Sequence, residues 1–235
     1  KKIDLKKDIC GFMLETFQGW GAIFYPKEFV KEISKLCKKN KILLTFDEMQ
    51  AGFARTGKKF GYEHYDVKPD LICCGKGMGG GVALSGVIGK KNIMDLPSVG
   101  EMSSTNSANP LACVAGMTVI NEINNKKILK RVNENGKYLK TGLEDIMYQN
   151  SSSIKYVMGR GMIYALIFDK KIPNIGIMLK KICFGAMQKG LLVVYTGRES
   201  IKIGPPLTIS KKAIKEGLQV LEEQILKVFK NDNIK

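Results

Sequence analysis

Two residues whose chemical types suit catalysis follow two apolar runs of this sequence. Asp47 follows the run at residues 42–46, and Lys76 follows the run at 71–74 after a single glycine. Each run has the length and bounded apolar character of a buried parallel strand. In open α/β sheets, ligands bind just beyond the carboxyl ends of the strands. We therefore expect the Asp47 carboxylate and the Lys76 amine, 29 residues apart (76 − 47), to face one cleft at one edge of a sheet.

Three motifs surround these two residues in a fixed order. Residues 47–57 read DEMQAGFARTG, residues 75–81 read GKGMGGG, and residues 104–110 read STNSANP. Together they resemble the motifs of class-III aminotransferases, which are pyridoxal-phosphate enzymes of fold type I. The resemblance runs through almost the whole chain and covers the carboxyl-terminal part of the family's longer chain. We therefore expect this chain to lack an amino-terminal part, including the family's main phosphate loop, and to be inactive alone.

The resemblance implies a role for four residues around pyridoxal 5'-phosphate. Lys76 would be the catalytic residue, forming the Schiff base and then moving a proton. Asp47 would keep the ring nitrogen protonated, Gln50 would reach the phenolic oxygen, and Met49 would pack on the ring. A lysine in this role must be able to become neutral, so we expect Lys76 to be partly buried near another cation.

The third motif is implied to bind the cofactor's phosphate. Thr105, with help from Ser104 and Ser103, would reach the phosphate bound in a neighbouring subunit, which predicts a homodimer with shared active sites. From the residues alone, such a cluster equally suits a helix cap. Glu48, next to Asp47, is expected to be structural.

Substrate choice depends on two positions where this chain departs from many relatives. Members that handle ω-amino acids carry a glutamate after the first strand and an arginine near the end of the chain. Here the matching residues are Trp20 and Lys202. Trp20 is interpreted either as the wall of an apolar substrate pocket or as a packing residue. Lys202 or the nearby Arg198 would then meet a substrate carboxylate.

The implied reaction is transamination, in which an amino group moves from an amine or (ω-)amino acid to a 2-oxo acid. The same residues also serve aminomutases, decarboxylases and racemases, so these reactions stay open. A third hypothesis is a non-enzymatic, basic α/β binding module.

The elements that position these residues predict an α/β fold. We expect a partial three-layer large domain with a mostly parallel sheet at 1–150, and a small carboxyl-terminal α+β domain at 151–235. Strands are predicted at 9–14, 42–46, 71–74, 83–88, 156–161, 162–168, 191–195 and 201–203. Helices are predicted at 26–39, 111–120, 128–146, 175–189 and 211–229. A polar linker, Asn150–Ser153, separates the two domains.

The composition of the chain argues against nucleic acid, metal ions and membranes as binding partners. The net charge is +16, but only four of the 38 basic residues are arginine, and the lysines are scattered along helix faces. This argues against a nucleic-acid surface, where clustered arginine and interleaved aromatics are expected. The six cysteines lack metal-ligand spacing and suit a reducing, cytoplasmic setting. No apolar run is long enough to cross a membrane.

Overall fold

The computed structural model describes residues 3–125 and 127–232. The chain forms two compact units. The first unit contains the described residues up to Phe17 together with Tyr25–Lys127, and the second contains Gln18–Phe24 together with the described residues from Ile128 onward. The short strands β2 (Phe17–Gln18) and β3 (Ile23–Phe24) form a separate two-stranded sheet.

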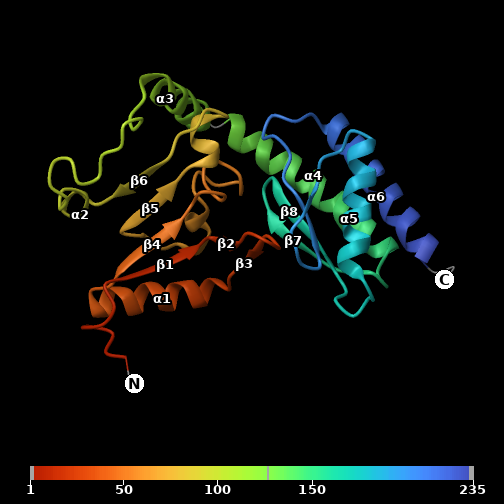
Figure 1. Cartoon of the computed structure of the whole chain (residues 1–235), viewed down its shortest axis with the longest axis horizontal. Coiled ribbons are helices and arrows are strands. Elements are labelled where there is room, and N and C mark those ends of the chain that lie inside the picture. Colours follow the sequence, from red (N-terminus) through yellow and green to blue (C-terminus); the bar gives the residue numbers. More distant parts are fainter. Residues whose placement is uncertain (1–2, 126, 233–235) are drawn as a thin grey trace. The chain divides into compact units, whose positions relative to one another are not determined.

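The first unit is built on a four-stranded sheet (Figure 1). Its strands are β1 (Gly11–Glu15), β4 (Leu43–Asp47), β5 (Leu71–Cys74) and β6 (Gly86–Gly89), in the order β1-β4-β5-β6. The first three run parallel, whereas β6 runs antiparallel to β5. Only the 11 residues 75–85 separate β5 from β6, and a parallel connection normally needs a dozen or more. The mixed, mostly parallel sheet confirms the predicted α/β class.

The helices of the first unit include the two predicted at 26–39 and 111–120. The unit contains α1 (Lys27–Asn40), η1 (Gly61–Tyr65), η2 (Lys76–Gly79), α2 (Lys91–Met94) and α3 (Pro110–Asn124). Helix α1 connects β1 to β4, begins after Pro26 and buries Val30 and Cys37. Proline suits this N-cap position because an N–H there would have no partner within the helix. Among the helices of residues 3–125 and 127–232, none is both long and apolar enough to cross a bilayer.

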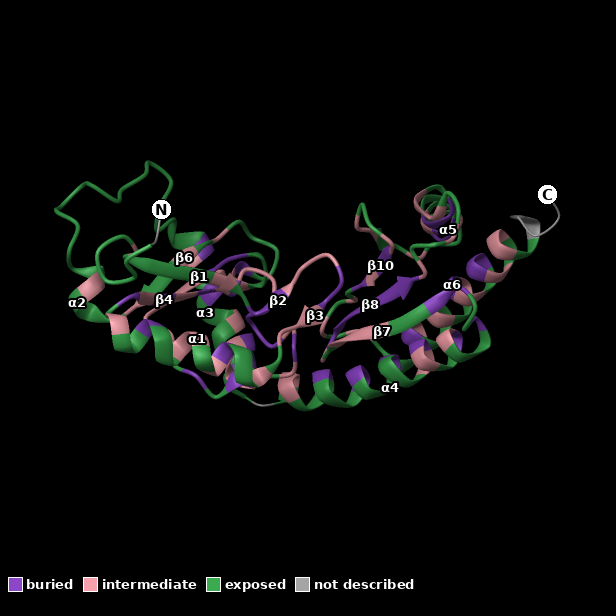
Figure 2. Ribbon diagram, turned by 90° about the horizontal axis from the view of Figure 1, so that it is seen from below, coloured by how far each residue is buried: buried purple, intermediate pink, exposed green. Residues whose placement is uncertain are grey.

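The second unit is an antiparallel sheet with three helices. The strands, in the order β7-β8-β10-β9, are β7 (Ile154–Arg160), β8 (Ile163–Phe168), β9 (Val194–Tyr195) and β10 (Ser200–Ile203). The helices are α4 (Lys127–Gln149), α5 (Ile175–Gln188) and α6 (Lys211–Asp232). Every residue of β8 is buried (Figure 2).

Helix α4 shares the core of the second unit. Its apolar residues Val132, Leu139, Leu143 and Ile146 belong to the same buried cluster as Leu166 of β8. The compact units therefore divide before α4, whereas the domain ranges expected from the sequence divide after it. The functional domain boundary at residue 150 stays a prediction.

Candidate active site

Parallel pairing brings Asp47 and Lys76 to the same edge of the first unit's sheet. In the register of β4 and β5, Asp47 lies opposite Cys73. Strand β5 ends at Cys74, one residue beyond this pair. After Gly75, Lys76 begins η2. The two side chains thus follow the carboxyl ends of neighbouring strands, where α/β proteins bind ligands. Their catalytic roles stay a prediction.

The backbone of Lys76 is in a conformation that few L-residues adopt. Its φ is +40°, in the left-handed region, which costs a non-glycine residue about 1–3 kcal/mol. The turn that holds it is closed by a hydrogen bond from the Met78 N–H to the Gly75 carbonyl, 2.9 Å long. Strained residues persist where the surroundings force them and are concentrated at functional sites. In the described chain the Lys76 side chain is exposed, and its burial in the full-length protein stays a prediction.

Gly75 connects the acidic motif to the lysine motif. A Cβ added to Gly75 would lie 2.3 Å from the Met49 Sδ atom. Any larger residue at this position would therefore displace the Met49 side chain. The sequence pattern gave no signal for this contact, since it depends on how the two turns pack together.

The side chains of β4 alternate between two environments. One face is buried and carries Leu44, Phe46 and Glu48. The opposite face is half-buried and carries Asp47 and Met49. The Oδ1 atom of Asp47 accepts a hydrogen bond from the Met49 N–H at 2.9 Å, which restricts the orientation of the carboxylate. Gln50, also half-buried, follows in the same turn.

Glu48 is fully buried, and its carboxylate accepts three hydrogen bonds. The donors are the hydroxyl of Thr16 and the backbone N–H groups of Gly61 and Tyr62, the latter two each at 2.7 Å. Burial raises the pKa of Glu48 above its ordinary value, and the hydrogen bonds act in the opposite direction. This network fits the structural role expected for Glu48. The sequence pattern did not reveal its partners.

The predicted phosphate residues lie in the exposed loop between α2 and α3 (Figure 2). The Ser107 hydroxyl donates to the Ser104 carbonyl at 2.7 Å, so Ser104 and Thr105 begin a closed turn. Asn109 caps α3 by accepting hydrogen bonds from Leu111 and Ala112. Helix α3 in turn packs against η2. Whether Ser104 and Thr105 bind phosphate stays a prediction.

The three predicted substrate residues form a cluster inside the second unit. The Arg198 guanidinium carbon lies 4.8 Å from the centroid of the Trp20 ring. Lys202 Nζ donates to the Gly19 carbonyl at 3.0 Å, so it supports the loop that carries Trp20. Ser200, which sequence reasoning missed, also holds this loop through a 3.0 Å hydrogen bond from its hydroxyl to the Trp20 carbonyl. Arg198 is exposed, whereas Lys202 is half-buried.

Similarity to curated proteins extends over nearly the whole chain. An acetylornithine aminotransferase of Caldanaerobacter subterraneus subsp. tengcongensis is 35% identical over 222 residues, which are 94% of this chain and 54% of the relative. A leucine/methionine racemase of Thermococcus litoralis is 36% identical over 225 residues, covering 94% and 50%. An ornithine aminotransferase of Oceanobacillus iheyensis is 34% identical over 221 residues, covering 93% and 53%. The chain spans about half the length of these relatives.

Solved structures of similar proteins share this fold. The acetylornithine aminotransferase of Elizabethkingia anophelis matches with a TM-score of 0.83 and 32% identity, over 94% of this chain and 55% of that one. A transaminase of the marine bacterium Virgibacillus matches with a TM-score of 0.86 and 26% identity, over 94% and 53%. Residues 2–225 match the family described as aminotransferase class-III. The chain therefore belongs to the class-III aminotransferases.

Proposed function

We propose that the full-length protein is a pyridoxal-phosphate-dependent aminotransferase that moves an amino group from an amine or amino acid to a 2-oxo acid. The observation that carries the proposal is the placement of Asp47 and Lys76 at one edge of the sheet, after the ends of two parallel strands, with Lys76 on a strained backbone. The names of two similar curated proteins, an acetylornithine and an ornithine aminotransferase, agree with it.

The residues at this edge fit the cofactor of the family, which depends on pyridoxal phosphate. Asp47 offers a carboxylate for a protonated ring nitrogen, and Gln50 offers an amide for a phenolic oxygen. Met49 supplies an apolar surface, and Gly75 leaves room for it. Lys76 supplies the amine that an aldehyde group requires. These four side chains provide a partner for the ring nitrogen, the phenolic oxygen, the ring face and the aldehyde group.

Each of these side chains has a separate task in the proposed reaction. When bound, the cofactor supplies an electron sink for the bonding electrons released at the substrate carbon. Asp47 holds a proton on the ring nitrogen, and the hydrogen bond from the Met49 N–H keeps its carboxylate oriented. Lys76 Nζ holds the cofactor between turnovers and, when released, moves a proton at the substrate carbon. Its exposure allows an incoming substrate to reach it.

We infer that the protein acts as a homodimer with shared active sites. Ser104 and Thr105, in an exposed loop, would contact the phosphate bound by the partner subunit. Helix α3 directly follows this loop and exposes Leu111 and Met117, which retain 80% and 62% of their surface. Exposed apolar patches of this kind often mark protein interfaces.

We infer that the substrate carries one carboxylate and an apolar or aromatic group. Trp20 would contact the apolar group, and the guanidinium of Arg198, stacked on Trp20, would bind the carboxylate. Lys202 is assigned to support the loop, since its ammonium donates to the Gly19 carbonyl. The six free cysteines support a cytoplasmic location.

A second candidate function is racemisation. The relative named leucine/methionine racemase is 36% identical to this chain, a value similar to that of the aminotransferases. Incubation with an amino acid and 2-oxoglutarate or pyruvate separates the two, because only transamination consumes the 2-oxo acid. Interconversion of enantiomers without its consumption would favour the racemase.

Reduction with borohydride tests the role of Lys76 directly. The full-length protein, loaded with pyridoxal phosphate and reduced, should carry the stable adduct on Lys76, and peptide mapping should find it there. Lys90→Arg, at a lysine paired with Asp70 in the same unit, is the control and should leave the adduct in place. An adduct on another lysine would remove Lys76 from its role. A protein without a cofactor absorbance band would instead support the binding-module hypothesis.

A further inference from the structure

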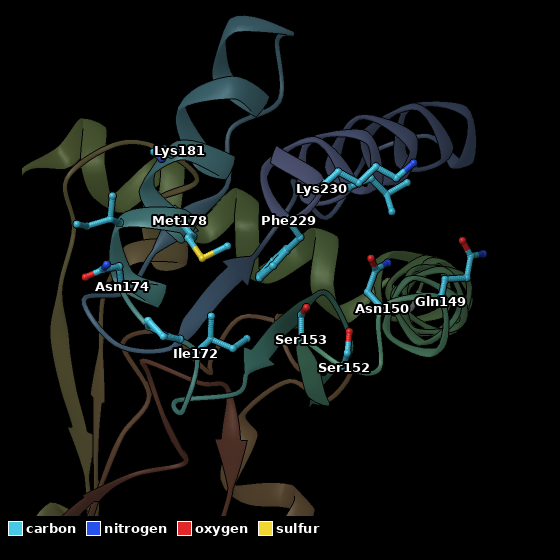
Figure 3. A pocket seen from close by; sticks show the side chains of 13 residues that line it. Gln149, Asn150, Ser152, Ser153, Ile172, Asn174, Met178, Lys181, Phe229 and Lys230 are labelled. Carbon is cyan, nitrogen blue, oxygen red and sulfur yellow. The ribbon is translucent and has the colours of Figure 1, made fainter. Parts of the chain in front are cut away.

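A pocket of about 820 Å³ lies wholly within the second unit, and no role has been assigned to it above. It opens between the end of α4, the loop before α5, and the helices α5 and α6 (Figure 3). Its volume falls within the range of about 300–1,000 Å³ that is typical of small-molecule sites. We call it the α5–α6 pocket.

The α5–α6 pocket combines an apolar surface with positive charge. Ile172, Met178 and Phe229 supply the apolar surface, and Figure 3 shows the phenyl ring of Phe229 near the middle of the site. Lys181 of α5 and Lys230 of α6 add two ammonium groups. Among the described lining residues there is no carboxylate.

Two acids on the elements around the pocket are paired with lysines outside its lining. Helix α5 has no acid in its first turn, so its positive amino-terminal end adds to the potential of the pocket. Asp169, in the loop before α5, is paired with Lys155 at 3.4 Å. Glu223 of α6 is paired with Lys189 at 2.9 Å. The described lining itself carries two lysines and no carboxylate.

Ser153 is one of the residues that line this pocket. Ser153 is 9% exposed, and its backbone groups are bonded to Asn150 and Asp169. Its hydroxyl makes no hydrogen bond to another residue in the described part of the chain, and its side chain lines the pocket (Figure 3). The hydroxyl lies at the pocket surface, where it can hydrogen-bond to water or to a ligand.

We propose that the α5–α6 pocket binds a small amphipathic carboxylate at a site separate from Lys76. The carboxylate accepts charge-assisted hydrogen bonds from Lys181 or Lys230, and Ser153 donates a further one. The apolar body of the ligand packs against Phe229 and Met178, whose thioether adapts to irregular shapes. Such a ligand is neither the cofactor nor a transamination substrate held at Lys76.

Titration of the cofactor-loaded full-length protein with 4-phenylbutyrate tests this proposal. Isothermal titration calorimetry should detect binding, and the Met178 methyl resonance, assigned with Met178→Leu, should shift during the titration. The neutral analogue 4-phenylbutanol should bind at least tenfold more weakly, because it offers no charge to the lysines.

Two double variants supply the decisive comparison. Lys181→Met with Lys230→Met should weaken binding at least tenfold, since methionine keeps the side-chain length and removes the charge. Lys180→Met with Lys215→Met removes two charges from the same two helices outside the pocket lining, and it should leave binding within twofold. Three results would overturn the proposal. They are equal weakening of binding in both double variants, a Met178 resonance that does not move, and no binding at millimolar concentrations.

Discussion

At the residue scale, the proposed function predicts which 2-oxo acids the full-length protein accepts. Lys202 is a point charge already hydrogen-bonded to the Gly19 carbonyl, so it offers no bidentate clamp for a second carboxylate. The full-length protein should therefore discriminate weakly, with pyruvate competing well against 2-oxoglutarate. Lys202→Arg should raise the preference for 2-oxoglutarate by roughly one to two decades, the equivalent of one charge-assisted hydrogen bond of about 1.5–3 kcal/mol.

Specificity constants for the two acceptors provide the measurement. Lys189→Arg, at an exposed lysine paired with Glu223, is the matched control and should leave the ratio unchanged. Two results would contradict this account: a thousandfold preference for 2-oxoglutarate in the unmodified protein, or a ratio that Lys202→Arg leaves untouched.

The sequence predicts where a site residue lies when that residue directly follows a strand. Asp47 and Lys76 follow apolar runs, and parallel pairing then places both at one sheet edge. The exposure of Lys76 and the contact between Met49 and Gly75 were not predictable, because they depend on how separate turns pack. The clustering of Trp20 with Arg198 arises from a pairing of residues 178 positions apart (198 − 20), which no local pattern encodes.

At the scale of elements, the Glu48 carboxylate connects the end of β4, the chain after β1, and η1. Glu48→Gln should destabilise the fold by about 1–3 kcal/mol at neutral pH, because one oxygen becomes an amide that faces an N–H donor. The amide protons of Gly61 and Tyr62, bonded to this carboxylate at 2.7 Å, should then exchange faster with solvent. Glu63→Gln is the control, since Glu63 accepts a hydrogen bond from the Phe60 N–H and not from these two.

The same residue predicts a pH dependence with a definite sign. Burial raises the pKa of Glu48 in the folded protein, so the folded state binds the proton more tightly than the unfolded chain. Its contribution to stability is therefore greatest below the unfolded pKa of about 4.3 and is lost as pH rises through the folded pKa. The free energy of unfolding should fall across this window in the parent and stay flatter in Glu48→Gln. An equal slope in both would show that Glu48 is not responsible.

The predicted and observed bounds agree best for elements that contain a strong apolar run. Strand β5 occupies residues 71–74 as predicted, and α5 ends one residue before the predicted end. The predicted strand at 83–88 was shifted, since β6 occupies Gly86–Gly89. Gly80 and Gly81 have φ values of +61° and +115°, so the chain is still turning there. Because of these turns, pairing with β5 begins only at Gly86, which lies opposite Cys74, three residues (86 − 83) after the start of the predicted strand.

At the scale of the whole chain, we predict that the apolar surface of the first unit is covered in the full-length, assembled protein. Val99, Met102, Leu111, Val114 and Met117 are all more than half exposed, which exceeds the scattered exposed residues normal for a monomer. The 235-residue chain produced alone should therefore self-associate. It should also bind pyridoxal phosphate poorly, because it spans only about half the length of its relatives. Light scattering and cofactor absorbance measure the two effects.

A pair of variants on α3 separates apolar association from charge effects in this experiment. Met117→Lys places a charge on the exposed apolar surface and should reduce the self-association of the isolated chain. Thr118→Lys adds the same charge at the next exposed position, where the side chain is already polar and hydrogen-bonds to the Val114 carbonyl at 2.9 Å, and should reduce it less. In the full-length protein, Met117→Lys should weaken the dimer and lower cofactor retention with it. A soluble monomer of the isolated chain with a stable cofactor band would contradict both the proposed interface and the shared active site.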